Sequence, residues 1–140
     1  MALRPRKPAK KALATAKKKR KNPEKGLQYR CQQWLEKSGW VHRLLIFHVA
    51  NERKGGIGAI LHFKRMGVLP GVGDYLAFRH AGDQLPRPAA AIELKDKDSG
   101  KQDKEQEAFQ KRWEACGNRY FLVRTLEDFQ NVVQAFALFG

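Results

Sequence analysis

The amino-acid sequence predicts an α/β fold in which a mixed central β-sheet is flanked by α-helices. The chain has 140 residues and a hydrophobic fraction of 42%, which suit one folded domain with a sizeable core. Short runs rich in Val, Ile, Leu and Phe alternate with segments whose apolar residues recur at helical spacing. The expected order is helix, strand, short helix, hairpin of two strands, helix, strand, helix.

The first helix is expected over Pro23–Ser38. Asn22 is a suitable N-cap before a proline at the first helical position, and Gly39 suits the far end. The apolar residues of this helix at helical spacing are Leu27, Cys31, Trp34 and Leu35. Glu24 lies three residues before Leu27 and projects from about the same face, which is unusual for a charge, although a first-turn glutamate also favours the helix dipole.

The middle of the chain is expected to form a strand, a short helix and a β-hairpin. The run WVHRLLIFHVANE suits a strand, and GAILHFKRMG suits a short helix closed by Gly67. A Pro/Gly turn leads into a strand that begins near Asp74, and the polar loop RHAGDQLPRP returns the chain into the strand AAAIELK. Because the two strands of a hairpin are antiparallel, Asp74 and Glu93 should meet at the same edge of the sheet.

The last third of the chain is expected to form a helix, a strand and a final helix. The helix over residues 102–115 should present Phe109 and Trp113 inward, with Gln106 on the same stripe. The run RYFLVRT suits a strand, and Thr125 opens the final helix with a pattern that resembles a capping box. The inward residues of the final helix are expected to be Leu126, Phe129, Val132, Val133 and Phe136.

Positive charge is concentrated at the N-terminus. Of the 28 Lys and Arg residues, ten lie in residues 1–23, which contain no acid, so the remainder holds 18 basic and 14 acidic residues. We expect residues 1–22 to be a tail that is disordered in isolation and binds a polyanion, and residues 23–140 to be the folded domain. A merely solubilising tail and a nuclear import signal are the alternatives. The residues expected to bind DNA are Lys17, Lys18, Lys19, Arg20, Lys21, Arg53, Lys54 and Lys101.

The sequence gives little support for a membrane protein, a secreted protein or a zinc site. No stretch approaches the roughly 20 apolar residues needed to cross a bilayer, and no apolar segment follows the N-terminal charges, so we expect a cytoplasmic protein. Cys31 and Cys116 are expected to be reduced core thiols, since no Cys or His lies at metal-ligand spacing. The histidines show no spacing for a metal site or a triad, although His48 and Asn51, near a strand end, could reach a substrate.

Asp74, Glu93 and Lys95 form a pattern that suits phosphodiester hydrolysis. Side chains alternate between the faces of a strand, so Glu93 and Lys95 share one face. Two carboxylates on adjacent strands can hold Mg²⁺ and leave positions for waters and a phosphate oxygen. Lys95 could then orient a water or neutralise charge in the transition state. Each residue alone also has an ordinary explanation: an exposed ion pair, a turn cap for Asp74, a solvated helix position for Gln106.

The ordered set GVGDYLAF, AAAIELK and GKQDKEQ resembles the PD-(D/E)xK nuclease superfamily and, within it, the VRR-NUC family. The resemblance covers about residues 24–133, and it implies a protein of a bacterial or phage-infected host cell. It implies a restriction-endonuclease-like core and a DNA endonuclease that uses Mg²⁺ or Mn²⁺. Branched DNA such as a four-way junction is the implied substrate, and a homodimer is implied because paired cuts need paired sites.

The same resemblance assigns roles to particular residues. It implies that Asp74 and Glu93 are metal ligands, with the Leu94 carbonyl as a third, and that Lys95 is catalytic. It gives Glu24 and Gln106 supporting roles in the site. Arg124, in the segment LVRTLED, is a further candidate.

The chain departs from the family pattern at one position. Gly73 stands where the family usually has proline, and this looser residue should hold Asp74 less rigidly and lower the activity. Two alternatives therefore stay open. One is a nuclease of the same fold that nicks duplexes or trims single-stranded ends, and the other is a basic nucleic-acid-binding module whose nuclease site has decayed.

Overall fold

The computed structural model describes residues 23–50, 56–80, 87–98 and 100–139. The helices are α1 (Pro23–Ser38), α2 (Ile57–Arg65), α3 (Lys104–Ala115) and α4 (Leu126–Phe139), and a 3₁₀ turn, η1, spans Trp40–His42. The strands are β1 (Leu44–His48), β2 (Tyr75–Arg79), β3 (Ala90–Leu94) and β4 (Arg119–Val123). This is the predicted order of elements.

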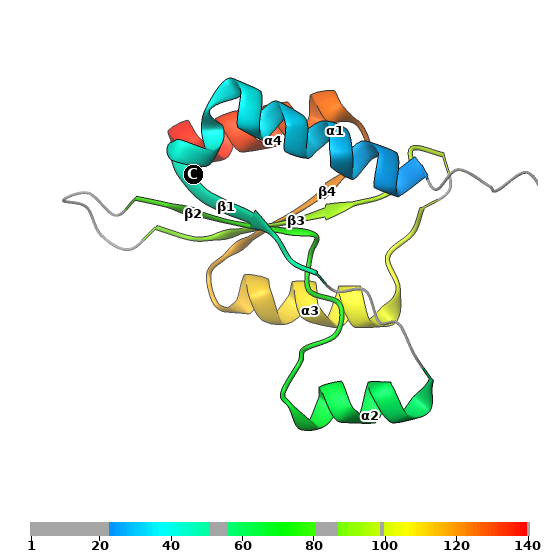
Figure 1. Ribbon diagram of the computed structural model, residues 1–140. Helices are drawn as coiled ribbons and strands as arrows, with labels where there is room; N and C mark the ends of the chain where they lie inside the picture. Colours follow the sequence, from blue (N-terminus) through cyan, green and yellow to red (C-terminus); the bar gives the residue numbers. More distant parts are fainter. Residues whose placement is uncertain (1–22, 51–55, 81–86, 99, 140) are drawn as a thin grey trace, which may run out of the picture.

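The four strands form one mixed sheet in the order β1-β2-β3-β4. The first two pairings are antiparallel, with Tyr75 opposite Ile92, and β3 pairs parallel to β4. Helices α1 and α4 cover one face of the sheet and α3 covers the other, as Figure 1 shows. The central strand β3 is buried along its whole length. The predicted α/β class with a mixed, helix-flanked sheet is confirmed.

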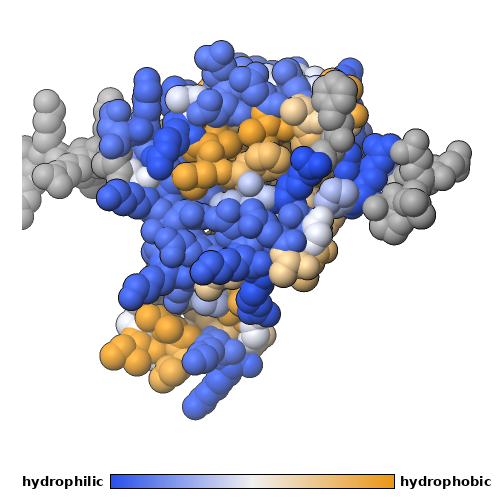
Figure 2. Space-filling model, turned by 180° about the vertical axis from the view of Figure 1, so that it is seen from behind, coloured by the Kyte–Doolittle hydropathy of each residue, from blue (hydrophilic) through white to orange (hydrophobic). Residues whose placement is uncertain are grey.

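Helix α2 projects away from the sheet, beyond α3 (Figure 1). It contains no buried residue, and its Ile57 and Leu61 side chains are 78% and 50% exposed. Figure 2 shows this apolar surface at the protruding end of the molecule. Gly67, with φ of 81°, ends the segment as predicted. In the part of the chain described here, no helix combines the length and the apolar character that a bilayer span requires.

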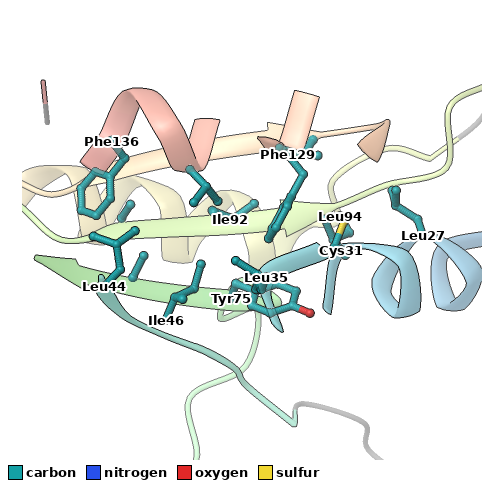
Figure 3. Packing of buried hydrophobic residues seen from close by; sticks show 14 residues of the cluster. Leu27, Cys31, Leu35, Leu44, Ile46, Tyr75, Ile92, Leu94, Phe129 and Phe136 are labelled. Carbon is teal, nitrogen blue, oxygen red and sulfur yellow. The ribbon is translucent and has the colours of Figure 1, made fainter. Parts of the chain in front are cut away.

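The hydrophobic core lies between the sheet and the α1/α4 layer. Tyr75 and Phe129 are fully buried with ring centroids 5.3 Å apart, and Leu35 of α1 packs beside them (Figure 3). The predicted stripes of both helices are confirmed: Leu27, Cys31, Leu35, Phe129, Val133 and Phe136 are buried, and Trp34, Leu126 and Val132 pack at the edge of the cluster.

Three sequence predictions were wrong in detail. The run WVHRLLIFHVANE is not a strand from its start, because Trp40–His42 form the 3₁₀ turn η1 and β1 begins at Leu44. Helix α3 begins at Lys104 rather than at residue 102, because Asp103 is its N-cap and forms a reciprocal capping box with Gln106. Cys116 is an exposed thiol rather than a core residue. It caps the C-terminus of α3, where Gly117, with φ of 83°, turns the chain at the surface.

Candidate active site

A cleft of about 370 Å³ opens at the edge of the sheet where β1 ends, β2 begins and β3 ends. Helix α1 contributes its first turn to the wall, and the N-terminus of α3 closes another side. All the predicted site residues that the structure describes, apart from Lys101 and Arg124, line this cleft: Glu24, His48, Asp74, Glu93, Leu94, Lys95 and Gln106. Residues from five separated segments therefore meet in one place.

Asp74 lies directly before β2 and is fixed by the strands on both sides. Its Oδ2 accepts a hydrogen bond of 2.7 Å from the Leu94 N–H of β3. Its carbonyl accepts from the Val49 N–H and from Nδ1 of His48, both at 2.8 Å. Burial raises the pKa of Asp74, while the Leu94 N–H and His48 oppose this shift and the Glu24 charge adds to it.

Gly73 is buried and packs against β3. A Cβ atom at this position would lie 3.1 Å from the Ile92 carbonyl oxygen, closer than side chains normally approach. The looseness expected of glycine before Asp74 is therefore opposed by packing and by the bonds that hold the next residue.

Glu93 is buried in the centre of the sheet, with an exposure of only 3%. Its Oε1 accepts from the Gln106 amide and lies 3.4 Å from Nζ of Lys95, which is itself 8% exposed. The pKa of Glu93 is raised to about 8, mainly by burial and next by the Asp74 charge, while Lys95 opposes the shift. An exposed ion pair is thus excluded as the explanation of Glu93 and Lys95.

Gln106 joins α3 to the carboxylate on β3. Its Oε1 accepts from the Asp103 N–H at 3.0 Å, and its Nε2 donates to Glu93. The N-cap of α3 thereby fixes the amide that contacts the site. Because Gln106 is half-buried and bonded at both ends of its amide, it is not a solvated helix residue.

Two glycines allow the surrounding loops to close on the site. A Cβ atom at Gly100 would lie 2.8 Å from the Asp96 nitrogen and 3.0 Å from Cβ of Lys95. A Cβ atom at Gly71, where φ is 78°, would lie 2.7 Å from the Gln106 nitrogen. Gly100 lets the chain fold back over Lys95, and Gly71 lets the approach to Asp74 pack against α3.

Several lining residues were not found from the sequence: Lys25, Gln28, Val49, Gly71, Val72, Asp103 and Glu105. The spacing of Asp103 and Gln106 is the signature of a capping box and could have indicated the first of these two as the helix start. The approach of Gly71 to α3 has no local signal, since it depends on tertiary packing.

The other predicted residues lie elsewhere. Lys101 is exposed and does not line the cleft. Arg124 does not line it either; its Nη1 donates to the Asp96 carbonyl at 2.7 Å. The remaining candidates fall outside the described residues: Lys17, Lys18, Lys19, Arg20, Lys21, Asn51, Arg53 and Lys54.

The donors in the cleft suit a hard divalent cation. The carboxylates of Asp74 and Glu93 supply oxygen atoms of the kind that Mg²⁺ and Mn²⁺ prefer as ligands. The charges of Asp74 and Glu24 raise the pKa of Glu93, and the Glu24 charge also raises the pKa of Asp74; a bound cation would relieve this repulsion. No group of three His, Cys, Asp or Glu side chains able to hold a metal occurs among the described residues. Mg²⁺ usually keeps several waters in its coordination shell, so two carboxylates suffice as protein ligands.

Comparison with known proteins identifies the fold. No family model matches the chain, and no curated protein matches it in sequence. A solved structure described as a VRR_NUC domain protein matches with a TM-score of 0.60 over 81% of this chain and 86% of that chain. The chain has a VRR-NUC-like fold. At the observed sequence identity of 17%, the likeness concerns the restriction-endonuclease-like architecture alone.

Proposed function

We propose that the protein is a metal-dependent nuclease that hydrolyses phosphodiester bonds in DNA. The observation that carries this proposal is the convergence of Asp74, Glu93 and Lys95 in one cleft, with both Glu93 and Lys95 buried. A structural role does not account for two carboxyl groups whose pKa values are both raised by burial and by neighbouring carboxylate charges, Glu24 in the case of Asp74 and Asp74 and Glu24 in the case of Glu93. The fold shared with a VRR_NUC domain protein supports the proposal.

The proposed roles follow from the contacts. Asp74, Glu93 and the Leu94 carbonyl would hold Mg²⁺ or Mn²⁺, which when bound would polarise the phosphate and make a water nucleophilic. Lys95 would offer its ammonium group to the nucleophilic water or to charge that develops on the phosphate. Gln106 holds one carboxylate oxygen of Glu93 and so orients the other. The half-buried Glu24 raises the pKa of Asp74 and of Glu93, and its negative charge would strengthen the attraction of the site for a cation.

We further propose branched DNA as the preferred substrate and a homodimer as the active form. Both rest on the sequence resemblance to the VRR-NUC family, since paired cuts at a junction need two sites. The folded nuclease domain would span residues 23–140, and the basic tail at residues 1–22 would add contacts to DNA that do not depend on sequence. Sedimentation of the full chain with and without a four-way junction tests the dimer.

Cleavage of end-labelled DNA tests the central proposal. Four-way junction, flap and linear duplex substrates are incubated with Mg²⁺, Mn²⁺ or chelator, and the intact protein is compared with Asp74→Asn. The asparagine keeps an oxygen that can accept from the Leu94 N–H, so loss of activity reports the loss of charge rather than of the hydrogen bond. We expect metal-dependent cutting that falls at least about a hundredfold in the variant, because a metal ligand is lost.

The same assay separates the alternatives. Preferential cutting of flaps or linear ends would replace the junction as substrate. Tight binding without cutting in any metal would reject the nuclease proposal and favour a DNA-binding module built on this fold.

A further inference from the structure

A second pocket, of about 320 Å³, lies on the other side of Lys95. It is formed by α1, by the segment that follows β3 and by the start of α4. Lys95 lines both this pocket and the catalytic cleft, so the two spaces are neighbours that share this residue in their walls.

The two pockets differ in charge. The cleft is lined by five acidic residues and two lysines, whereas the second pocket is lined by four basic residues and one acid. The basic residues of the second pocket are Arg30, Lys95, Lys97 and Arg124, and the acid is Asp96. A cation therefore favours the first space and an anion the second. Lys95 pairs with Glu93 at 3.4 Å, which leaves Arg30, Lys97 and Arg124 beside the one carboxylate of this pocket, so ion pairing within the pocket does not account for the set.

The donors in the second pocket are positioned for an oxyanion. Nη1 of Arg124 donates to the Asp96 carbonyl, which fixes the guanidinium plane and uses one of its five N–H donors. The Thr125 hydroxyl accepts from the Asp128 N–H at 3.1 Å, so its own proton can be donated elsewhere. Arg30 and Lys97 are exposed at the rim. Guanidinium forks and hydroxyls are typical phosphate ligands.

We infer that this basic pocket binds a backbone phosphate of the substrate strand, next to the phosphate that is cleaved. The inference rests on the proposed nuclease function and adds the path of the strand: from the acidic cleft, past Lys95, into the pocket formed by Arg30, Lys97, Arg124 and Thr125. Contacts to a neighbouring phosphate fix the register of the strand, so that the scissile bond lies over Asp74 and Glu93.

Removal of the two rim charges tests this pocket. The variant Arg30→Gln with Lys97→Gln is compared with Lys37→Gln with Lys111→Gln, which removes two exposed lysines that line neither pocket. Binding of a labelled four-way junction is measured in chelator over a salt series. We expect the rim variant to bind about tenfold more weakly and its salt slope to be shallower by about one to two units. The control should change by much less, and thermal melts should show both variants folded.

Cleavage of DNA in which one linkage is an uncharged methylphosphonate gives the second measurement. Once the cut is mapped, a single methylphosphonate is placed at each linkage beside it. Intact protein should lose cleavage at one adjacent linkage, and the rim variant should be insensitive to that substitution. Equal binding by rim variant and control, or no sensitive linkage, would overturn the inference even if cutting is normal. If no DNA is cut at all, the nuclease proposal fails, and the binding comparison still decides whether the pocket contacts a phosphate.

Discussion

At the scale of single residues, Glu93 couples the chemistry of the site to the stability of the fold. Its pKa is raised from 4.5 to about 8 in the folded protein, chiefly by burial. The folded state therefore binds the proton more tightly than the unfolded chain does. The free energy of unfolding is unaffected by this group below about pH 4.5 and falls as the pH rises towards 8.

We predict that Glu93→Gln stabilises the metal-free protein at pH 8, because the glutamine need not ionise. The gain in free energy of unfolding should grow between pH 5 and pH 8, by at most about 1.4 kcal/mol per pH unit. Urea denaturation in chelator at a series of pH values measures it. Glu114→Gln, on the exposed end of α3, should show no such growth. A gain at pH 5 as large as that at pH 8 would contradict the raised pKa.

Gly100 controls the position of Lys95. We predict that Gly100→Ala lowers cleavage at least about tenfold, because its Cβ would displace the Asp96 backbone or the lysine. Gly58→Ala is the matched control, since a Cβ there meets nothing within 4 Å. Single-turnover cleavage at saturating protein separates this loss from weaker binding. Normal turnover by Gly100→Ala would show that the lysine tolerates displacement.

At the scale of elements, the β2–β3 hairpin places the carboxylates and could be predicted from the sequence. Residue patterns in the sequence predicted both strands and the polar loop between them. Antiparallel pairing alone then brings Asp74 beside the end of β3. The contacts between elements could not be predicted. Burial of Lys95 depends on a loop that folds back at Gly100, and the contact of Gly71 with α3 joins segments more than 30 residues apart. Local propensities contain no information on either contact.

Gly71 offers a test of that long-range packing. We predict that Gly71→Ala destabilises the protein by more than Gly67→Ala, although both glycines have similar positive φ values of 78° and 81°. Alanine at residue 67 should cost only about 1 to 2 kcal/mol for the left-handed backbone. A Cβ at residue 71 also meets the α3 backbone, so its cost should be at least about 1 kcal/mol larger. Equal midpoints in urea would mean that α3 moves aside freely.

At the scale of the whole molecule, the basic tail and the folded domain should contribute separately to DNA binding. Residues 1–21 hold ten basic residues and no acid. We predict that their deletion weakens binding to junction, flap and linear DNA by similar factors and flattens the salt dependence. Filter binding over a salt series measures both effects. Unchanged affinity, or a loss confined to junctions, would contradict a tail that binds phosphates without regard to structure.

The contrast between β3 and α2 has a consequence for how the molecule opens. Strand β3 is paired on both sides and wholly buried, so its amide hydrogens should exchange with solvent only when the entire domain unfolds. Helix α2 has nine residues and none is buried, and a helix of that length is marginal without tertiary support. Its amides should exchange fastest among the described helices. Glu93 is thus built into the slowest-exchanging strand, and the chain can unwind α2 repeatedly while the carboxylates stay in register.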